Sequence, residues 1–453
     1  MSDLSLTRAD FPPGFLFGTA TSAYQIEGHA EGGAGPTHWD SFAATPGNVA
    51  NAENGDVACD HLNRWQEDLD LIAGAGLDLY RFSTSWARVL PEGRGKVNEA
   101  GLDFYDRLVD GLLARGIKPM ATLYHWELPS ALADLGGWAN PDISHRFAEF
   151  ADVIARRLGD RLHATATINE PWCVSWLSHF LGHHAPGLRD IRATARAMHH
   201  VCLAHGRAVA ALRAAGLGNI GAVTNMEYTL AADDSPEAAA AARRYDAIYN
   251  RFFLGGMVHG VYPDEVLAGI GPHLPAGWER EMDTIRAPID WLGLNYYTCK
   301  RIGPADGPWP ALAERPAQGR LTDMGWEWHP EGLEALLVRI HRELAPGLPV
   351  IVTENGMAAP DRPGADGVVA DTDRIAYLDA HLGAIRRAIA AGAPVAGYTI
   401  WSLMDNFEWA LGYDKRFGLV RVDFETLART PKASWHALAR ALAGERRGHA
   451  PKR

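Results

Sequence analysis

The chain has 453 residues, of which 47% are hydrophobic and 22% are charged, so it can build a large buried core. Its formal net charge is −12, because 55 acidic residues outnumber 43 basic ones. This balance argues against nucleic acid and anionic lipid surfaces as partners, since both require a cationic face.

The cysteines predict a reducing compartment. Cys59, Cys173, Cys202 and Cys299 are widely spaced and form no CxxC pair, which is typical of buried free thiols. Residues 1–10 contain no apolar segment of a secretory signal, and no apolar run is long enough to span a bilayer. We therefore expect a cytoplasmic protein without a membrane partner, and a disordered basic end at residues 445–453.

Short β-rich runs recur along the chain, and most are apolar without alternation. That pattern is expected of parallel strands that are buried on both faces. The runs are residues 15–19, 77–83, 118–123, 162–168, 220–224, 291–295, 350–353 and 395–400.

Helical patterns separate these runs. In the first of them Leu62, Trp65, Leu69 and Ile72 share one face at helical spacing. The predicted helices are residues 60–76, 101–116, 143–158, 191–215, 236–257, 331–344, 372–391 and 432–443. This strand–helix alternation predicts an α/β fold, a closed (β/α)₈ TIM barrel, with an open doubly wound sheet as the alternative. We expect one catalytic domain over residues 1–453, with its core at about 11–443.

Four connections are long, and each follows the C-terminal end of a predicted strand, where barrel enzymes build their sites. They are residues 27–57, 172–190, 300–330 and 402–431. The Pro- and Gly-rich stretch 303–319 is predicted to be a loop.

Two glutamates stand at the ends of predicted strands. Glu170 follows the fourth run and precedes Pro171, which cannot continue a strand; Glu354 follows the seventh run and precedes Asn355-Gly356. We expect both carboxyl groups at the same rim of the barrel. Glycoside hydrolysis uses such a pair, with retention of configuration at ~5–5.5 Å separation and inversion at ~6.5–9.5 Å.

The chain resembles glycoside hydrolase family 1, the β-glucosidase family, from about residue 11 to 442. The resemblance rests on several motifs in order along the chain. They are Thr-x-Asn-Glu-Pro at 167–171, Thr-Glu-Asn-Gly at 353–356, Phe-Gly-Thr-Ala-Thr-Ser-Ala-Tyr-Gln-Ile-Glu-Gly at 17–28, Tyr-Arg-Phe-Ser-x-Ser-Trp at 80–86, Tyr-His-Trp at 124–126, Gly-Leu-Asn-Tyr-Tyr at 293–297 and Trp-Ser-Leu-Met-Asp-Asn-Phe-Glu-Trp at 401–409.

The resemblance implies that Glu170 is the acid/base and Glu354 the nucleophile of a retaining mechanism. Arg81 is expected to pair with Glu354, Tyr297 to donate a hydrogen bond to it, and Asn295 belongs to the same catalytic group. We expect the negative charge of Glu354 to raise the pKa of Glu170 and keep it protonated near neutral pH.

The family's sugar-binding positions are also present. The resemblance implies that Asn169 holds the 2-hydroxyl, Glu408 accepts from the 4- and 6-hydroxyls, and Trp401 stacks under the ring. The full set expected to contact the sugar is Gln25, His125, Trp126, Asn169, Trp401, Glu408, Trp409 and Phe417. The carboxylate of Glu408 argues against a 6-phosphosugar, because it would repel the phosphate.

The aglycone side is expected to be lined by Trp172, His179, Asn225, Trp326 and Trp328. The chain departs from the family pattern at His329, where an aromatic residue is common, at Glu127, where Asp is common, and at Ile168, where Phe is common. The first departure bears on aglycone preference, and the other two are conservative.

We expect no cofactor and no metal. The pairs His183-His184 and His199-His200 lack zinc-site spacing, and a calcium site at Asp361 and Asp366 is without further support.

The leading hypothesis is an exo-acting β-glucosidase that accepts a β-glucoside or cello-oligosaccharide and tolerates β-galactosides or β-fucosides. A transglycosidase and a catalytically silent β-glycoside-binding protein on the same scaffold are the alternatives, and a homo-oligomer is left open.

Overall fold

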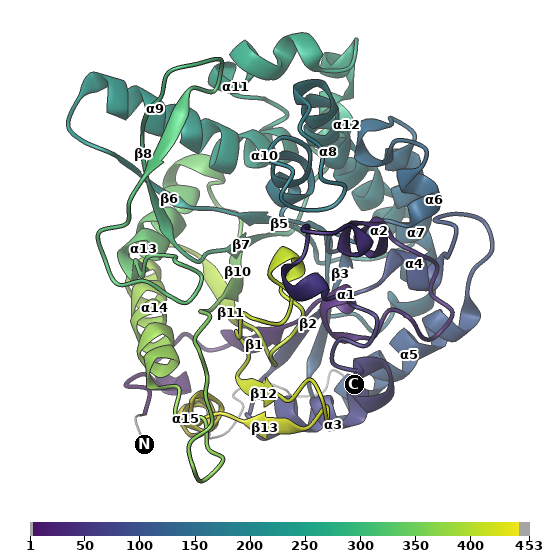
Figure 1. Ribbon diagram of the computed structural model, residues 1–453, viewed down its shortest axis with the longest axis vertical. Helices are drawn as coiled ribbons and strands as arrows, with labels where there is room; N and C mark the ends of the chain where they lie inside the picture. Colours follow the sequence, from purple (N-terminus) through teal and green to yellow (C-terminus); the bar gives the residue numbers. More distant parts are fainter. Residues whose placement is uncertain (1–2, 444–453) are drawn as a thin grey trace.

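The computed structural model describes residues 3–443, and its centre is a closed barrel of parallel strands (Figure 1). Around the barrel the strands follow the order β1-β2-β3-β4-β5-β7-β10-β11. Their bounds are β1 Leu16–Ala20, β2 Leu79–Ser83, β3 Lys118–Tyr124, β4 Ala164–Asn169, β5 Ile220–Asn225, β7 Trp291–Asn295, β10 Val350–Asn355 and β11 Val395–Trp401. All eight predicted strands are present, so the predicted barrel is confirmed and the open sheet is wrong. The expected disordered end at residues 445–453 lies outside the described residues.

Helices form a ring outside the barrel, as Figure 1 shows. The main ones are α3 His61–Gly74, α5 Glu99–Ala114, α7 Ile143–Leu158, α8 Ile191–Ala214, α9 Pro236–Asp246, α13 Pro330–Arg339, α14 Thr372–Ala390 and α15 Ala433–Ala441. Capping explains several of their starts: the side chain of Asp190 accepts from Ala193 N at the start of α8, and that of Ser235 accepts from Ala238 N at the start of α9.

Two predicted helices are interrupted. The pattern over residues 236–257 contains α9, a π-helical turn η5 (Ala247–Arg251), α10 (Phe252–Leu254) and a second π-helical turn η6 (Gly255–His259). The pattern over 331–344 is α13 followed by the π-helical turn η9 (Ile340–Leu344). The short helices are α1 Ala23–Ile26, α2 His38–Ala44, α4 Trp86–Val89, α6 Ser130–Ala133, α11 Asp264–Ile270 and α12 Met282–Ile285.

Apolar side chains from the strands form a buried cluster within the barrel. Its members are Leu79, Met120, Ala164, Ala166, Val223, Trp291 and Ile351. Further along the same strands, towards their C-terminal ends, the buried side chains become polar, among them Arg81, Asn169, Asn295 and Glu354. The barrel therefore carries its apolar core at one end and its polar groups at the other.

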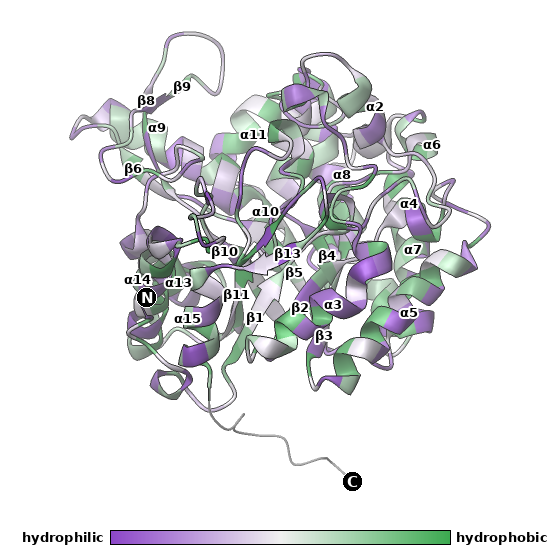
Figure 2. Cartoon of the chain, turned by 60° about the horizontal axis from the view of Figure 1, so that its bottom comes forward, coloured by the Kyte–Doolittle hydropathy of each residue, from purple (hydrophilic) through white to green (hydrophobic). Residues whose placement is uncertain are grey.

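The prediction of a loop over residues 303–319 holds for 305–311 and 316–319 and is wrong for the strand residues between and before them. Here β8 (Cys299–Pro304) and β9 (Leu312–Arg315) pair in antiparallel fashion, and β8 also pairs with β6 (Tyr228–Ala231). Figure 2 shows this small sheet beside α9 and away from the barrel strands. The stretch lacks an apolar run because the sheet is only partly buried, and β6, the other strand that pairs with β8, is distant in the sequence.

The last connection also contains a small antiparallel pair, β12 (Val420–Val422) with β13 (Arg429–Pro431). Among the described residues, no helix combines the length and the apolar character needed to cross a membrane.

Candidate active site

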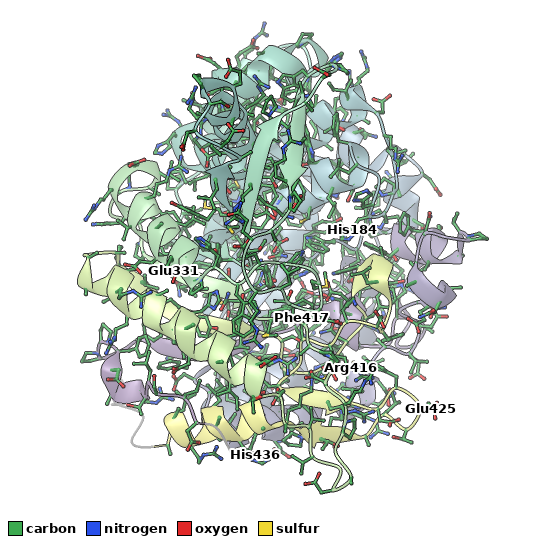
Figure 3. The ribbon with its side chains drawn as sticks, turned by 60° about the vertical axis from the view of Figure 1, so that its left-hand side comes forward. His184, Glu331, Arg416, Phe417, Glu425 and His436 are labelled. Carbon is green, nitrogen blue, oxygen red and sulfur yellow. The ribbon has the colours of Figure 1, made fainter. Side chains whose placement is uncertain are left out.

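A cavity of about 760 Å³ opens at the C-terminal ends of the barrel strands. Phe417, on the loop after β11, and His184, on the loop after β4, both line it and are labelled in Figure 3. The predicted site residues on its wall are His125, Trp126, Glu170, Trp172, Asn225, Asn295, Tyr297, Trp326, Glu354, Trp401, Glu408, Trp409 and Phe417.

Local backbone irregularities accompany the two glutamates. The pairing register of β4 with β5 shifts between Ala166 and Asn169, and that of β10 with β7 shifts between Val352 and Glu354. Glu170 itself has a φ of 50°, in the left-handed region that side-chain-bearing residues rarely adopt. Such strain persists only where the surrounding structure holds it, and it gathers at functional sites.

Gly356 allows β10 to end close to β11. A Cβ atom at this position would lie 1.8 Å from the carbonyl oxygen of Trp401. Its φ is not positive, so glycine is required here for space and not for a left-handed backbone.

Glu354 is held at both oxygens. Arg81 Nη1 forms a short ion pair with Oε1, and the hydroxyl of Tyr297 donates to Oε2 at 2.6 Å. Burial, followed by the charge of Glu354, raises the pKa of Tyr297 well above its usual range, so the phenol stays protonated and donates. Glu354 is 3% exposed, and its oxygens keep defined partners in this dry environment.

Glu170 has a different environment. Asn295 Nδ2 donates to Oε1 at 2.5 Å, and the thiol of Cys173 donates to Oε2 at 3.0 Å. Burial raises the pKa of Glu170, and the Glu354 carboxylate raises it further. The sequence had pointed only to Glu354 as the cause of the raised pKa, but burial is the larger cause, because Glu170 is only 5% exposed.

Asn169 connects the two glutamates. Its Oδ1 accepts from Arg81 Nη2 at 2.7 Å and from Asn295 Nδ2 at 3.0 Å. Its Nδ2 donates to His125 Nε2 at 3.2 Å. Burial and the nearby Arg81 lower the pKa of His125 well below its usual range, so this imidazole is neutral. A continuous polar frame therefore runs from β2 through β4 and β7 to β10.

The far side of the cavity is aromatic and acidic. The ring of Trp401 stacks on His125 at 5.6 Å, and Trp409 packs at 4.6 Å on Trp39, which lies behind it. Burial, followed by the charges of Glu354 and Glu170, raises the pKa of Glu408 to about 8. Glu408 Oε2 has no hydrogen-bond partner among the described residues, so it is available to a ligand hydroxyl.

Three predicted residues lie behind the wall of the cavity. Arg81 and Asn169 belong to the polar frame, and Gln25 donates to Asn406 Oδ1 at 2.9 Å and to the carbonyl oxygen of Phe407 at 2.8 Å. Gln25 therefore braces the loop that carries Glu408.

Two expectations do not hold, because His179 and Trp328 are not among the residues that line the cavity. His179 is buried in the turn after Leu177, where burial lowers its pKa to about 4. Trp328 is covered by the guanidinium of Arg320 at 4.1 Å and packs against Tyr377 at 5.4 Å. The indole is therefore packed against these two side chains and is not part of the cavity wall.

Much of the outer cavity was not predicted from the sequence. Its additional side chains include the aromatic residues Trp176, Phe180, Tyr245, Tyr249 and Trp309, together with Cys173, His184, Lys300 and the acidic residues Glu227, Asp306 and Glu314. Cys173 could have been found from its position three residues after Glu170. Trp309 could not, because it reaches the cavity only through the pairing of β8 with β9.

The residues considered for metals have other partners. Asp361 pairs with Arg374 and Lys432 in the interior, and the ring nitrogens of His199 contact Tyr262 and Glu281. Among residues 3–443 there is no group of three or more His, Cys, Asp or Glu side chains that could hold a metal ion.

A family model, curated relatives and solved structures all place the chain in the same family. Residues 7–442 match the model of glycosyl hydrolase family 1. A β-glucosidase of Agrobacterium sp. is 46% identical over 446 residues, covering 96% of each chain. A bifunctional β-D-glucosidase/β-D-fucosidase of Bifidobacterium breve is 46% identical over 457 residues, covering 96% of this chain and 98% of its own. The solved structure of a Thermotoga maritima family 1 β-glucosidase in complex with isofagomine lactam has a TM-score of 0.93 at 44% identity, covering 96% of this chain and 99% of its own.

Proposed function

Because this chain belongs to glycosyl hydrolase family 1, we propose that it is a retaining β-glucosidase that removes terminal non-reducing β-D-glucosyl residues. The proposal rests above all on Glu170 and Glu354, which line the same cavity but have different electrostatic environments. Glu354 is ion-paired with Arg81, while burial and the Glu354 charge favour the protonated form of Glu170. Double displacement needs this combination of one carboxylate and one carboxylic acid.

In the first step Glu354 attacks the anomeric carbon and forms a glycosyl ester, while the bond to the aglycone oxygen breaks. Glu170 gives its proton to that leaving oxygen. The role of Glu354 is supported by its contacts with Arg81 and Tyr297, which orient both oxygens of the nucleophile.

In the second step a water molecule replaces the aglycone. Once Glu354 is an ester its charge is gone, so the pKa of Glu170 falls and the residue can accept a proton from the water. The water oxygen then attacks the anomeric carbon and releases Glu354. The net result is hydrolysis with retained configuration.

The sugar is proposed to lie between Trp401 and the polar frame. The neutral His125, which Asn169 holds from behind, would contact a ring hydroxyl, and Glu408 would accept from the 4- and 6-hydroxyls. Trp126, Trp409 and Phe417 complete this part of the wall. A β-fucoside lacks the 6-hydroxyl yet keeps the other contacts, so we propose it as a second substrate, in keeping with the bifunctional Bifidobacterium breve relative.

The aglycone is proposed to occupy the outer cavity, beside Trp172, Asn225 and Trp326. Trp172 Nε1 and Asn225 Oδ1 are buried without hydrogen-bond partners in the described part of the chain, so each can serve a substrate hydroxyl. A cello-oligosaccharide or another small β-glucoside fits this combination of aromatic faces and polar groups.

The two alternatives are not favoured. A silent binding protein would not need two buried carboxyl groups beside each other, since this arrangement raises the free energy of the folded protein. A transglycosidase would use the same groups, but the relatives are named as β-glucosidases and as a glucosidase/fucosidase. Product analysis with excess acceptor sugar separates hydrolysis from transfer.

We further propose one catalytic domain over the whole chain, and a cytoplasmic location that rests on the four cysteines being free, buried thiols.

The test is a proton NMR time course with an aryl β-glucoside. We expect β-glucose first, before mutarotation, and loss of turnover in both Glu354→Ala and Glu170→Ala. If α-glucose appears first, the mechanism is inverting. If the wild type leaves the glucoside intact, the activity itself is refuted.

A further inference from the structure

The two oxygens of Glu170 are held by groups of different chemistry. Oε1 accepts from the side-chain amide of Asn295 at 2.5 Å, and Oε2 contacts the thiol of Cys173 at 3.0 Å. The side-chain nitrogen of Asn295 can only donate. The orientation of this amide is fixed, because Thr353 Oγ1 donates to Oδ1 of the same side chain at 2.7 Å. Oε1 is therefore the less favourable of the two oxygens for a proton while this contact lasts.

A thiol differs from an amide because it can donate or accept. Towards ionised Glu170 the S–H donates a hydrogen bond to Oε2, and towards protonated Glu170 the sulfur accepts a hydrogen bond from Oε2–H, which keeps its proton. Cys173 can therefore hydrogen-bond to the carboxyl group in both of its protonation states. Because Asn295 donates to Oε1, Oε2 is the oxygen that gains and loses the proton.

The chain places Cys173 for this contact. Glu170 precedes a helical turn in which Cys173 N donates to the Glu170 carbonyl oxygen at 2.9 Å, so the two side chains lie on one face at i and i+3. Asn225 Nδ2, at the end of β5, approaches the sulfur at 3.7 Å and donates to Tyr249 Oη at 2.7 Å. The thiol is 6% exposed and lines the cavity.

From this geometry we propose that Cys173 is a positioning residue for the acid/base, holding Oε2 as the oxygen that delivers and later accepts the proton. The inference rests on the proposed function, since it concerns the acid and base steps of that reaction. In the first step the Oε2–H bond breaks as the leaving oxygen gains the proton. In the second step a proton from water returns to Oε2 as the water oxygen bonds to the anomeric carbon.

The test compares Cys173→Ala, which removes the thiol, with Cys173→Ser, whose hydroxyl also donates and accepts. The matched control is Cys202→Ala, because Cys202 is a buried free thiol on α8 that does not line the cavity. Each protein is assayed with phenyl β-glucoside, whose leaving group needs a proton, and with 2,4-dinitrophenyl β-glucoside, whose leaving group departs without one. Melting temperatures show that each variant folds.

We expect Cys173→Ala to lower kcat/KM for the phenyl glucoside about tenfold, the size of one lost hydrogen bond to a charged group. For the dinitrophenyl glucoside kcat/KM should stay within about twofold, while kcat falls because the second step still needs the base. Cys173→Ser should restore most of the phenyl glucoside rate, and Cys202→Ala should match the wild type.

Equal losses of kcat/KM on both substrates, or wild-type values for Cys173→Ala on both, would overturn the proposal. These outcomes differ from failure of the proposed function, in which the wild type hydrolyses neither glucoside or Glu170→Ala keeps full activity on the phenyl glucoside.

Discussion

Tyr297 donates its hydroxyl hydrogen to Glu354 Oε2 over 2.6 Å, while Arg81 pairs with the other oxygen of the same carboxylate. The carboxylate of Glu354 is therefore oriented by two residues, one on β2 and one that follows β7. The hydroxyl of Tyr297 thus holds Glu354, whereas its ring packs on Trp326 with 5.2 Å between the ring centroids.

Tyr297→Phe tests this contact, since it removes the hydroxyl and keeps the ring. We expect kcat to fall about tenfold, because one charge-assisted hydrogen bond to Glu354 is lost. Steady-state kinetics with an aryl β-glucoside measure the change. Tyr413→Phe is the control, since its hydroxyl donates to the Asn54 carbonyl oxygen on an exposed loop; if both variants lose equally, orientation of Glu354 is not the cause.

The pH profile should report the raised pKa of Glu170. Only the protonated acid can donate, so kcat/KM falls as pH rises through the pKa of Glu170 in the free enzyme. Because burial and Glu354 raise that pKa, the alkaline limb should lie well above the ~4.3 of an unperturbed glutamic acid. A profile of kcat/KM against pH with phenyl β-glucoside measures it, and a decline beginning near pH ~4.3 would contradict the assignment.

Glu408 is expected to distinguish glucosides from fucosides. In Glu408→Gln the glucoside loses an acceptor for its 6-hydroxyl, whereas a fucoside has no such hydroxyl to lose. We expect kcat/KM to drop about tenfold more for the aryl β-glucoside than for the aryl β-fucoside. Equal losses on both substrates would show that Glu408 does not read the 6-position.

A buried ion network supports the loop that carries Glu408. Lys432, which is 0% exposed, contacts Asp361 and donates to Asp405 Oδ1 at 2.6 Å. Lys432→Met removes a positive charge that offsets the two buried carboxylates, so the free energy of unfolding should fall by about 3–5 kcal/mol. Denaturant unfolding measures it, with Lys415→Met as the control, because Lys415 pairs with Asp323 and Asp414 nearer the surface. Similar stabilities of the two variants would refute the role of the network.

Glu127 should make stability depend on pH. Both carboxyl oxygens are buried without hydrogen-bond partners among the described residues, and burial raises the pKa from 4.5 to about 7. The folded state favours the protonated form of Glu127. The contribution of this residue to the free energy of unfolding is therefore complete below pH ~4.5 and is lost as pH rises through about 7, with a total loss of ~3 kcal/mol at most.

Glu127→Gln, which cannot ionise, should therefore melt at a higher temperature than the wild type at pH ~8 and at a similar temperature at pH ~4.5. Thermal unfolding at the two pH values measures this. Glu425→Gln, on an exposed turn labelled in Figure 3, should leave both temperatures unchanged. A pH-independent difference for Glu127→Gln would contradict the expectation.

The barrel could be predicted from the sequence because its strands are buried on both faces. Such strands are continuous apolar runs, and Pro171 marks the end of one of them. The two glutamates could be predicted with them, since the C-terminal ends of parallel strands meet at one rim. The family motifs then supplied the partners Arg81, Tyr297 and Asn295, and these contact the glutamates in the structure either directly or through Asn169.

The rest depended on tertiary contacts, some between distant segments such as β6 and β8 and others between near neighbours such as Arg320 and Trp328. Trp309, which lies between β8 and β9, lines the cavity, whereas Trp328 is covered by the guanidinium of Arg320 and does not line it. No local pattern encodes such contacts, because the partly buried sheet has no continuous apolar run and a loop side chain turns towards whichever neighbour covers it. The sequence by itself determined the barrel and the two glutamates at its rim, together with their order along the strands. Only the tertiary structure decided how deeply Glu170 is buried, and therefore why its pKa rises, because burial is a property of all the surrounding elements together.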